Sequence, residues 1–323
     1  MQLKVLVKRA LARHLAAIVT VATALACTSA AHAEEKLRIG FQKSSTLIAV
    51  LKTQGTLERE LNKQGISVSW HEFPSGLPLL ESLNVGNIDL SADVADTVPV
   101  FAQAAGARLT YFAREAPSPS AQAIVVHKDS KLSSLADLKG RKVAVTKAAG
   151  SHYLLIAALQ SAGLKFSDIE PAYLTPADGR AAFENRKVDA WVTWEPFLSG
   201  VQRQLPTRTL ADGKGLAQYQ RYYLTTQAYA IKHQPVLKTV FNELQKTGQW
   251  VKAHPGEAAK LLGPLWGNLD VATVEAANQR RTYQILPVEA DKLDEQQRIA
   301  DTFFEAGLLP AKVDAADVQV WKP

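Results

Sequence analysis

The chain has 323 residues, 37 basic and 31 acidic side chains, and a formal net charge of +6. Four of the basic residues lie within the first 33 positions, which hold no acidic residue, so the rest of the chain carries 33 basic against 31 acidic side chains. This near balance removes the charge argument for nucleic acid binding. The only cysteine is Cys27, so a chain that begins after residue 33 has neither disulfides nor thiol chemistry.

The first 33 residues are typical of a cleaved signal peptide. A positive stretch that ends at Arg13 precedes an uncharged apolar run at residues 15–26, and Ala31-His32-Ala33 matches the small-x-small cleavage rule. We therefore expect cleavage after Ala33 and a periplasmic protein, since no later stretch is long and apolar enough to cross a bilayer. Residues 25–27 (Leu-Ala-Cys) leave an alternative, in which Cys27 carries a lipid anchor.

Beyond the signal peptide, short strand-like runs alternate with amphipathic helical stretches. The first half begins with a strand at Leu37, a polar turn and a helix, followed by a strand, a Pro-Ser-Gly turn, a helix and a strand that carries Asp89. The second half repeats this order from Arg141 and ends on a strand that carries Asp189. This pattern predicts an α/β fold with mainly parallel sheet.

The two halves match at nearly constant spacing. Pairing residue 42 with 146, 76 with 179 and 89 with 189 gives offsets of 104, 103 and 100 residues. Such offsets indicate two similar folding units, although strand–turn–helix is so common a unit that chance similarity remains the alternative.

Two extended segments are expected to connect two lobes, one near residues 121–130 and the return near residues 221–233. The predicted organisation is a signal peptide at 1–33, a first lobe at 34–121 plus 227–323, and a second lobe at 122–226. The helical segments after residue 233 are expected to pack around the first lobe. Two crossings form a hinge on which lobes can close over a ligand.

Motifs for catalysis and cofactor binding are absent from the sequence. There is no G-x-S-x-G, no H-E-x-x-H and no P-loop, and the glycines at 213 and 215 do not continue into a dinucleotide-binding pattern. We therefore predict no enzyme, no cofactor and no metal, although a carboxylate pair stays open because Asp and Glu are common. The histidines after residue 33 are scattered and none pair at metal-ligand spacing: His71, His127, His152, His233 and His254.

Polar turns that open helices are the main candidates for a binding site. Ligands gather at this edge of an open α/β sheet, and a helix start offers unpaired N–H groups and partial positive charge to an anion. Each serine can instead be an N-cap, each glycine can serve turn geometry, and the histidine can be an ordinary helix residue. The candidates are Gln42, Ser44, Ser45, Ser75, Gly76, Gly150, Ser151 and His152, with a further turn at residues 176–179.

Two more stretches supply candidates. Trp191 is interpreted as core and Trp194 as a wall of the cleft. Glu195 would repel an anion, so it is expected to meet a cationic part of a ligand, hold a donor in place or cap the following helix. Asp96 before Thr97 is typical of a helix N-cap whose neighbours face the ligand.

The chain resembles the aliphatic sulfonate-binding proteins of bacterial ABC importers. The resemblance spans residues 39–323 in the family's order and includes IGFQKSS, WHEFPSGLPLLESLNVGNIDL, KAAGSHYLL, VDAWVTWEPF and VDAADVQVWKP. It implies a two-lobed periplasmic binding protein fold (type II) with two crossing strands as hinge. It also implies a monomeric receptor that delivers a small organic anion to an inner-membrane permease and its ATPase.

The resemblance places the sulfonate near residues 42–45, 75–76, 96–97 and 150–152, with Trp194 and Glu195 on the opposing wall. This chain departs from the family pattern around Asp96, at Gln227 where an arginine is common, and at Glu195 where an aspartate is common. Taurine, sulfate esters and nitrate therefore remain alternative ligands. A thiamine-precursor enzyme on the same fold is disfavoured because the chain has no cysteine after Cys27.

Overall fold

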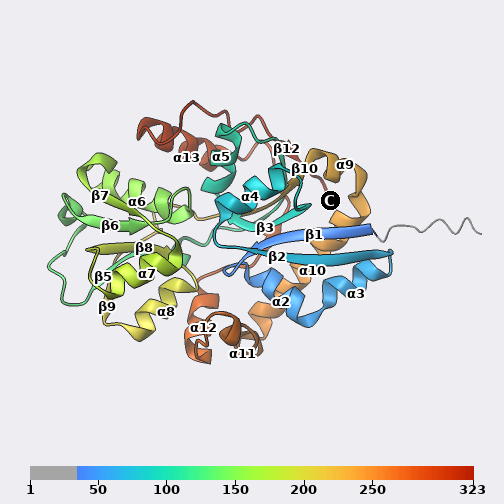
Figure 1. Ribbon diagram of the computed structural model, residues 1–323, viewed down its shortest axis with the longest axis horizontal. Coiled ribbons are helices and arrows are strands. Elements are labelled where there is room, and N and C mark those ends of the chain that lie inside the picture. The colour runs from blue at the N-terminus through green and yellow to red at the C-terminus, as the bar shows by residue number, and fades with distance from the viewer. Residues whose placement is uncertain (1–34) are drawn as a thin grey trace, which may run out of the picture. The chain divides into compact units, whose positions relative to one another are not determined.

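The computed structural model describes residues 35–323, so the predicted signal peptide and Cys27 lie outside the described residues. Two β-sheets organise residues 36–323, which form one unit (Figure 1). The first sheet has seven strands, ordered β11-β4-β10-β3-β1-β2 with β12 beside β4, and the second has five, ordered β7-β6-β8-β5-β9. These sheets form the centres of two lobes, as the alternation of strands and helices predicts.

The first lobe contains the elements of the first sheet and its covering helices. Its strands are β1 (Glu35–Gln42), β2 (Ile66–Phe73), β3 (Leu90–Ala95), β4 (Leu109–Glu115), β10 (Arg221–Thr226), β11 (Ile285–Leu286) and β12 (Gln319–Val320). Its helices are α2 (Thr46–Gln54), α3 (Thr56–Asn62), α4 (Gly76–Asn84), α5 (Thr97–Ala104), α9 (Gln227–Lys232), α10 (Gln234–Ala253), α11 (Pro255–Leu265) and α12 (Val271–Gln279).

The second lobe is smaller. Its strands are β5 (Gln122–His127), β6 (Lys142–Val145), β7 (Glu170–Tyr173), β8 (Ala190–Trp194) and β9 (Thr207–Asp212), and its helices are α6 (Gly150–Ser161), α7 (Pro176–Glu184) and α8 (Phe197–Gln204). Short 3-10 helices occur at Pro119–Ala121, Leu135–Leu138 and Phe166–Asp168. One further helix, α13 (Asp294–Glu305), follows β11.

The internal repeat is present in both sheets. The order β2-β1-β3-β10-β4 matches β7-β6-β8-β5-β9, with β1 parallel to β3 and β6 parallel to β8. In each lobe one aspartate ties the last parallel strand to the first: Asp89 accepts the backbone N–H of Arg38, and Asp189 accepts that of Lys142, both at 2.8 Å. The spacing of the two halves therefore reflects a repeated structure.

The hinge is a pair of antiparallel strands that continues through both lobes. β4 lies beside β10 in the first sheet, and β5 lies beside β9 in the second. The connecting segments, residues 116–121 and 213–220, bond to one another through Ser118 N–H to Gln218 O and Gly213 N–H to Pro119 O, each 3.0 Å. A Cβ on Gly213 would lie 2.5 Å from the Pro119 carbonyl oxygen, so this approach requires glycine.

The expected return segment at residues 221–233 was placed too late along the chain. Residues 221–226 are already β10, inside the first sheet, and residues 227–232 form α9. The Thr226 hydroxyl accepts the N–H of Tyr229 and caps this helix, which ends the extended backbone. The chain therefore crosses at residues 213–220.

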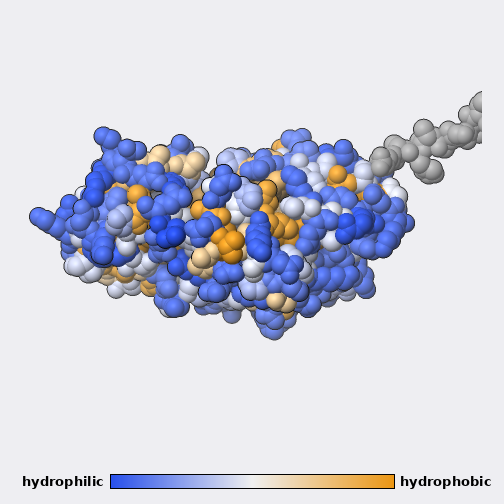
Figure 2. Space-filling model, turned by 90° about the horizontal axis from the view of Figure 1, so that it is seen from below, coloured by the Kyte–Doolittle hydropathy of each residue, from blue (hydrophilic) through white to orange (hydrophobic). Residues whose placement is uncertain are grey.

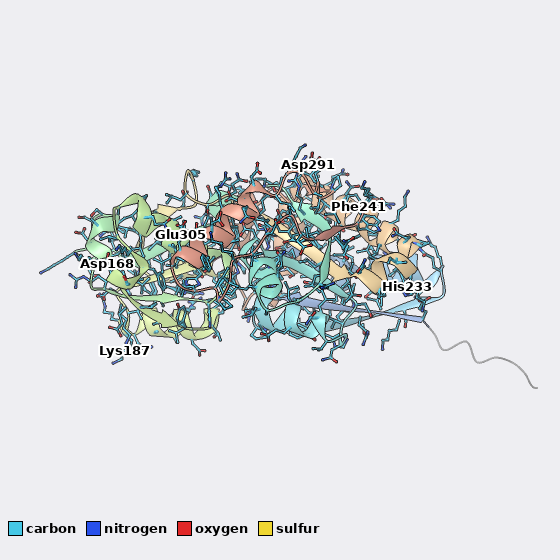
Figure 3. The ribbon with its side chains drawn as sticks, turned by 90° about the horizontal axis from the view of Figure 1, so that it is seen from above. Asp168, Lys187, His233, Phe241, Asp291 and Glu305 are labelled. Carbon is cyan, nitrogen blue, oxygen red and sulfur yellow. The ribbon has the colours of Figure 1, made fainter. Side chains whose placement is uncertain are left out.

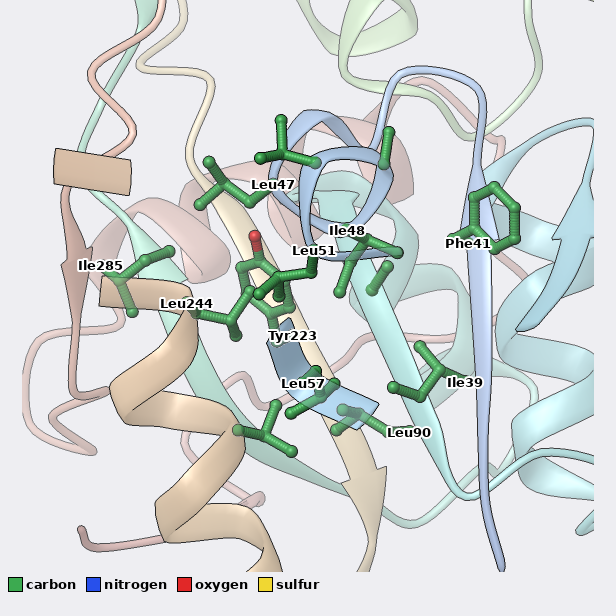
Figure 4. Close-up of a cluster of buried hydrophobic side chains, with 14 of the residues drawn as sticks. Ile39, Phe41, Leu47, Ile48, Leu51, Leu57, Leu90, Tyr223, Leu244 and Ile285 are labelled. Atoms are coloured by element: carbon green, nitrogen blue, oxygen red, sulfur yellow. The ribbon is translucent and has the colours of Figure 1, made fainter. Parts of the chain in front are cut away.

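Buried apolar side chains fill both faces of each sheet. In the close-up of Figure 4, Leu47, Ile48 and Leu51 of α2 pack with Leu244 of α10 against Tyr223 of β10. The opposite face of the first sheet packs on α4 and α5, and the faces of the second sheet pack on α6 and on α7 with α8. Each sheet thus has helices on both sides, which explains the near-continuous apolar runs of its strands.

The C-terminal helices do not all pack around the first lobe, contrary to the expectation. Helices α10 and α11 cover the first sheet, but α12 contacts α8 of the second lobe, and α13 contacts both α5 and α6. Ile299 and Phe303 of α13 belong to the core beneath α6. Figure 3 shows the end of α13, at Glu305, beside the lobe that carries Asp168. The buried residues of α13 lie along one face of the helix, and this helix contacts α5 of the first lobe and α6 of the second.

No helix within residues 35–323 has the length and apolar character that a membrane span requires. The face shown in Figure 2 is mainly hydrophilic, with hydrophobic atoms in limited patches. Among the described residues, the large hydrophobic side chains that are exposed are scattered along the chain.

Candidate functional site

A small cavity of about 20 Å³ lies between the two lobes. The first lobe and the hinge supply the ends of β1 and β3, the starts of α4 and α5, and the start of β10, whereas the second lobe supplies the turn before α6 and the end of β8. The lining residues are Gln42, Ser75, Gly76, Leu77, Ala95, Val98, Lys147, Ala148, Ala149, Gly150, Trp194, Tyr219 and Arg221. This set includes two cations and no carboxylate, so the cavity suits an anion.

The start of α4 contributes a hydroxyl and backbone N–H groups. Ser75 occupies the N-cap position in extended conformation, with φ −158° and ψ 173°, but its side chain makes no capping hydrogen bond. The first N–H groups of a helix have no intrahelical acceptor, so those of Gly76 and Leu77 are available with the hydroxyl. A Cβ on Gly76 would lie 2.8 Å from Val98 Cγ2, which explains the glycine by close packing against α5.

The turn before α6 contributes backbone groups from the second lobe. Ala148 has a positive φ of 60°, a conformation that L-residues seldom adopt, and Ala149 is the N-cap in extended conformation. A Cβ on Gly150 would lie 2.6 Å from the Tyr219 ring and 3.1 Å from Ala95 Cβ. The absence of a side chain at Gly150 therefore lets the second lobe approach the hinge and the first lobe.

Arg221 is the cation at the base of the cavity. It is only 2% exposed, and its Nε donates to Asp93 Oδ2 at 2.5 Å while its Nη1 donates to the Tyr219 hydroxyl at 2.8 Å. Burial lowers the pKa of Arg221, but Asp93, Tyr219 and Glu115 together raise it by more, so that the pKa lies above its ordinary value and the guanidinium stays charged.

A second buried arginine continues this network behind the cavity. Arg281 donates from Nη2 to Asp93 Oδ2 at 3.0 Å and to Glu115 Oε2 at 2.5 Å, and Tyr223 donates to Glu115 Oε1 at 3.1 Å. Burial raises the pKa of Glu115, and the charge of Arg281 works against that rise. Two arginines balance two carboxylates, so the network holds Arg221 in a fixed orientation without adding net charge.

Five of the twelve residues predicted for the site line the cavity. They are Gln42, Ser75, Gly76, Gly150 and Trp194. Gln42 donates from Nε2 to the Asp93 carbonyl at 3.2 Å, which fixes its amide beside the Arg221 network. Trp194 packs edge-on against Phe197, with ring centroids 5.7 Å apart.

The serines that follow Gln42 lie behind the cavity wall. Ser45 accepts the Gln42 N–H at 3.1 Å, and Ser44 accepts a longer bond from Arg221 at 3.4 Å. Ser45 is the N-cap of α2, yet its side chain makes no capping bond. Both side chains therefore support groups that do line the cavity.

Asp96 and Thr97 also lie behind the wall. The Asp96 carboxylate accepts the N–H groups of Thr97 at 3.1 Å and Gln220 at 2.9 Å, so it caps α5 and ties it to the hinge. Burial, with a smaller effect of Glu295, raises the pKa of Asp96 to about 7. Thr97 donates its hydroxyl to the Ala148 carbonyl of the other lobe at 2.7 Å.

His152 and Ser151 are fully buried within α6. His152 Nδ1 accepts the Ala148 N–H at 3.3 Å, and its ring lies among the rings of Phe166, Tyr173 and Phe303. Burial, with a smaller effect of Lys147, lowers the pKa of His152 to about 3. The imidazole is therefore neutral at ordinary pH and supports the turn through Ala148.

Glu195 points away from the cavity although it follows Trp194 directly. Its carboxylate accepts the N–H and hydroxyl of Ser199, at 3.0 and 2.9 Å, and forms an ion pair with Arg280 at 2.5 Å. Gln227, expected near the cleft, is exposed at the start of α9 and borders a different groove. The cavity therefore contains no ionised carboxylate to repel an anion or to bind an ammonium group.

Sequence reasoning missed Lys147, Tyr219 and Arg221. One available signal was an arginine that opens the apolar run Arg221-Tyr-Tyr-Leu, since an arginine within a buried strand needs a buried partner. That partner, Asp93, lies 128 positions away in the sequence.

The sequence and the fold of this chain are similar to those of known proteins. The family model described as NMT1/THI5 like matches residues 61–258. The solved periplasmic aliphatic sulphonate binding protein SsuA from Escherichia coli is 41% identical, with 89% of this chain and 97% of that chain covered and a TM-score of 0.80. The alkanesulfonate-binding protein SsuA from Xanthomonas axonopodis pv. citri, bound to MOPS, is 37% identical, with 87% and 96% covered and a TM-score of 0.82.

A curated relative from Escherichia coli (strain K12), whose name includes the words aliphatic sulfonates-binding protein, is 41% identical over 90% of this chain and 89% of its own. These likenesses extend over both lobes and confirm the two-lobed fold predicted from the sequence. Because the family model covers more than half of the chain and these relatives cover nearly all of it, the chain belongs to the NMT1/THI5-like family, alongside the periplasmic aliphatic sulfonate-binding proteins.

Proposed function

We propose that this chain is the substrate-binding component of a bacterial ABC importer and that it captures an aliphatic sulfonate in the cavity between its lobes. The observation that carries the proposal is the composition of the cavity lining. It combines the starts of α4 and α6 with the Ser75 hydroxyl and the Arg221 guanidinium, and it includes no carboxylate. A sulfonate is ionised at physiological pH and has only acceptor oxygens. It therefore requires donors, and each hydrogen bond to a charged group contributes about 1.5–3 kcal/mol.

The apolar part of the lining suits the organic end of such a ligand. Leu77, Val98 and Trp194 offer hydrocarbon and aromatic surface beside the polar groups. The MOPS bound by the Xanthomonas relative is itself a sulfonate, which supports the same ligand class here.

Taurine, a sulfonate with an ammonium group, is a weaker candidate. Its cation would need a carboxylate, and the two considered from sequence are both engaged elsewhere: Glu195 with Ser199 and Arg280, and Asp96 with backbone N–H groups. An alkanesulfonate without a charged tail leaves no such group unpaired. The lining also contains neither histidine nor cysteine, the groups on which a thiamine-precursor type of enzyme would depend.

In this role the chain binds and releases its ligand without making or breaking a covalent bond. The chain is expected to reach the periplasm after cleavage at Ala33, to act as a monomer and to close on the hinge at residues 116–121 and 213–220. Closure over the ligand buries both ends of the molecule and creates the shape that a permease and its ATPase recognise.

Isothermal titration of residues 34–323 tests this function. We expect heat of binding at one site with ethanesulfonate, weaker binding of ethyl sulfate and taurine, and the weakest binding of nitrate, which cannot use the apolar wall. Absence of heat with every sulfur compound would exclude the sulfonate receptor, and preference for nitrate would assign a different anion.

A further inference from the structure

Glu195, which is buried, and Arg280, which is partly exposed, form an ion pair that joins the two lobes outside the cavity. Glu195 ends β8 of the second lobe, directly after the cavity wall at Trp194, and its side chain is 2% exposed. Arg280 follows α12, which packs on α10 and α11 of the first lobe, and its side chain is 31% exposed. Neither residue lines the cavity, so the pair acts on the lobes and has no direct contact with a ligand.

Arg280 supplies the charge that compensates the buried Glu195 carboxylate. Burial raises the pKa of Glu195, whereas the charge and hydrogen bond of Arg280 lower it. The Arg280 guanidinium also donates to Gln202 of α8 at 2.9 Å, so it holds two points of the second lobe. If the lobes separate, these contacts are lost and the carboxylate regains water.

A second contact joins the lobes at the turn before α6. Thr97 at the start of α5 donates its hydroxyl to the Ala148 carbonyl at 2.7 Å. Ala148 has a positive φ, and its N–H is held by His152, so both of its backbone polar groups are bonded in this conformation. Each of the two cross-lobe contacts is made next to residues that line the cavity, Val98 and Trp194.

We infer that Arg280 is a positioning residue that sets how much of the protein is in the closed form, through its ion pair with Glu195, and so scales the affinity for every ligand alike. The inference rests on the proposed function for its binding readout. Apparent affinity falls by the same factor as the population of the binding-competent form. A residue that contacts the ligand would instead change affinities by different factors for different tails.

Arg280→Gln in residues 34–323 tests the inference with ethanesulfonate and butanesulfonate. We expect about a tenfold loss of affinity for both ligands by the same factor, carried by a faster dissociation rate, since loss of one partner of a desolvated charge pair acts mainly on dissociation. Arg280→Lys should recover part of the loss because it keeps the charge. In a double-mutant cycle, Glu195→Gln should remove most of the effect of Arg280→Gln.

Arg203→Gln is the matched control. Arg203 pairs with Asp270 at 3.3 Å across the same seam between α8 and α12, but the two side chains are 68% and 48% exposed. Its loss should change affinity by less than about twofold, because exposed pairs contribute little.

A second measurement needs no ligand and separates this inference from the proposed function. Small-angle scattering should show a larger radius of gyration for ligand-free Arg280→Gln than for the unmodified protein. Affinity within twofold of the unmodified protein, losses that differ more than threefold between the two tails, or an unchanged radius of gyration would each overturn the inference. Failure of the unmodified protein to bind either sulfonate would instead count against the proposed function.

Discussion

The two walls of the cavity are built on different physical principles. The first-lobe wall rests on a buried network in which Arg221 and Arg281 are balanced by Asp93 and Glu115. The second-lobe wall is made largely of backbone groups from residues 147–150, with one exposed lysine and Trp194. The first wall is thus fixed before a ligand arrives, whereas the second meets the ligand only when the lobes approach.

Removal of Arg281 should have the largest effect and should act on stability. Arg281→Met leaves Glu115 and Asp93 buried with less compensating charge, so the free energy of unfolding should fall by about 3–5 kcal/mol. Denaturant unfolding of residues 34–323 measures this. Lys63→Gln, at an exposed pair with side-chain exposures of 68% and 39%, is the control and should change it by less than about 0.5 kcal/mol. If Arg281→Met lowers the free energy of unfolding by less than about 1 kcal/mol, the buried charge network does not hold the first-lobe wall in place.

The pH dependence of stability should differ between the walls. The pKa of Asp96 rises from 3.8 to about 7 on folding, so the folded state holds an extra proton between these values. Stability from this group is complete at low pH and is lost as pH rises, at about 1 kcal/mol per pH unit between pH 5 and 7.

His152 of the second lobe acts in the opposite sense. Its pKa falls from 6.5 to about 3, so its contribution is lost as pH falls below 6.5. Comparison of Asp96→Asn with the unmodified protein isolates Asp96, because His152 is common to both. The unmodified protein should lose stability relative to the variant as pH rises from 5 to 8, and parallel curves would refute the raised pKa.

A methyl group at Gly150 should block the approach of the second wall. The Cβ of Gly150→Ala would meet the Tyr219 ring at 2.6 Å, a clash that the lobes avoid by staying apart. Affinity for ethanesulfonate should fall about tenfold, because closure of the lobes then carries a cost within the range of about 1–3 kcal/mol for overpacking. The midpoint of thermal unfolding should stay nearly constant, because the separated lobes avoid the clash. Gly256→Ala, where the nearest side-chain atom would be 3.5 Å away, is the control. Undiminished affinity in Gly150→Ala would mean that the lobes need not meet there.

The hydroxyl of Ser75 should affect affinity and leave stability unchanged. Ser75→Ala removes a donor that makes no capping bond, so affinity for ethanesulfonate should fall about fivefold. Thr175→Ala is the matched comparison, because the Thr175 hydroxyl accepts the Asp178 N–H at the start of α7. It should lower stability by about 1 kcal/mol without change in affinity. The reverse pattern would make Ser75 a structural residue.

The fold was predictable because its signals are local. Alternation of strands and helices, the near-constant offset between halves and the glycine-containing turns each depend on neighbouring residues. The return crossing was placed too late because β10 and α9 are adjacent and share similar apolar residues, and nothing before folding shows that β10 lies between β3 and β4. The packing of α13 on α6 likewise depends on long-range contacts.

The candidate site was predictable only where it is made of turns. Ser75, Gly76 and Gly150 line the cavity because helix starts at strand ends converge in this fold. Arg221 and Tyr219 enter it through strand pairing between distant parts of the chain, and Asp96 and Glu195 leave it because their carboxylates find partners that spacing cannot show.

A crystal structure of residues 34–323 with 2-bromoethanesulfonate tests the central claim most directly. The account predicts one molecule between the lobes, with its sulfonate oxygens within hydrogen-bonding distance of Ser75, Arg221 and the backbone N–H groups at the start of α6. Anomalous scattering should locate the bromine against Trp194 and Leu77. A molecule bound outside this cavity, or a sulfonate that faces Trp194 with its tail toward Arg221, would contradict the account.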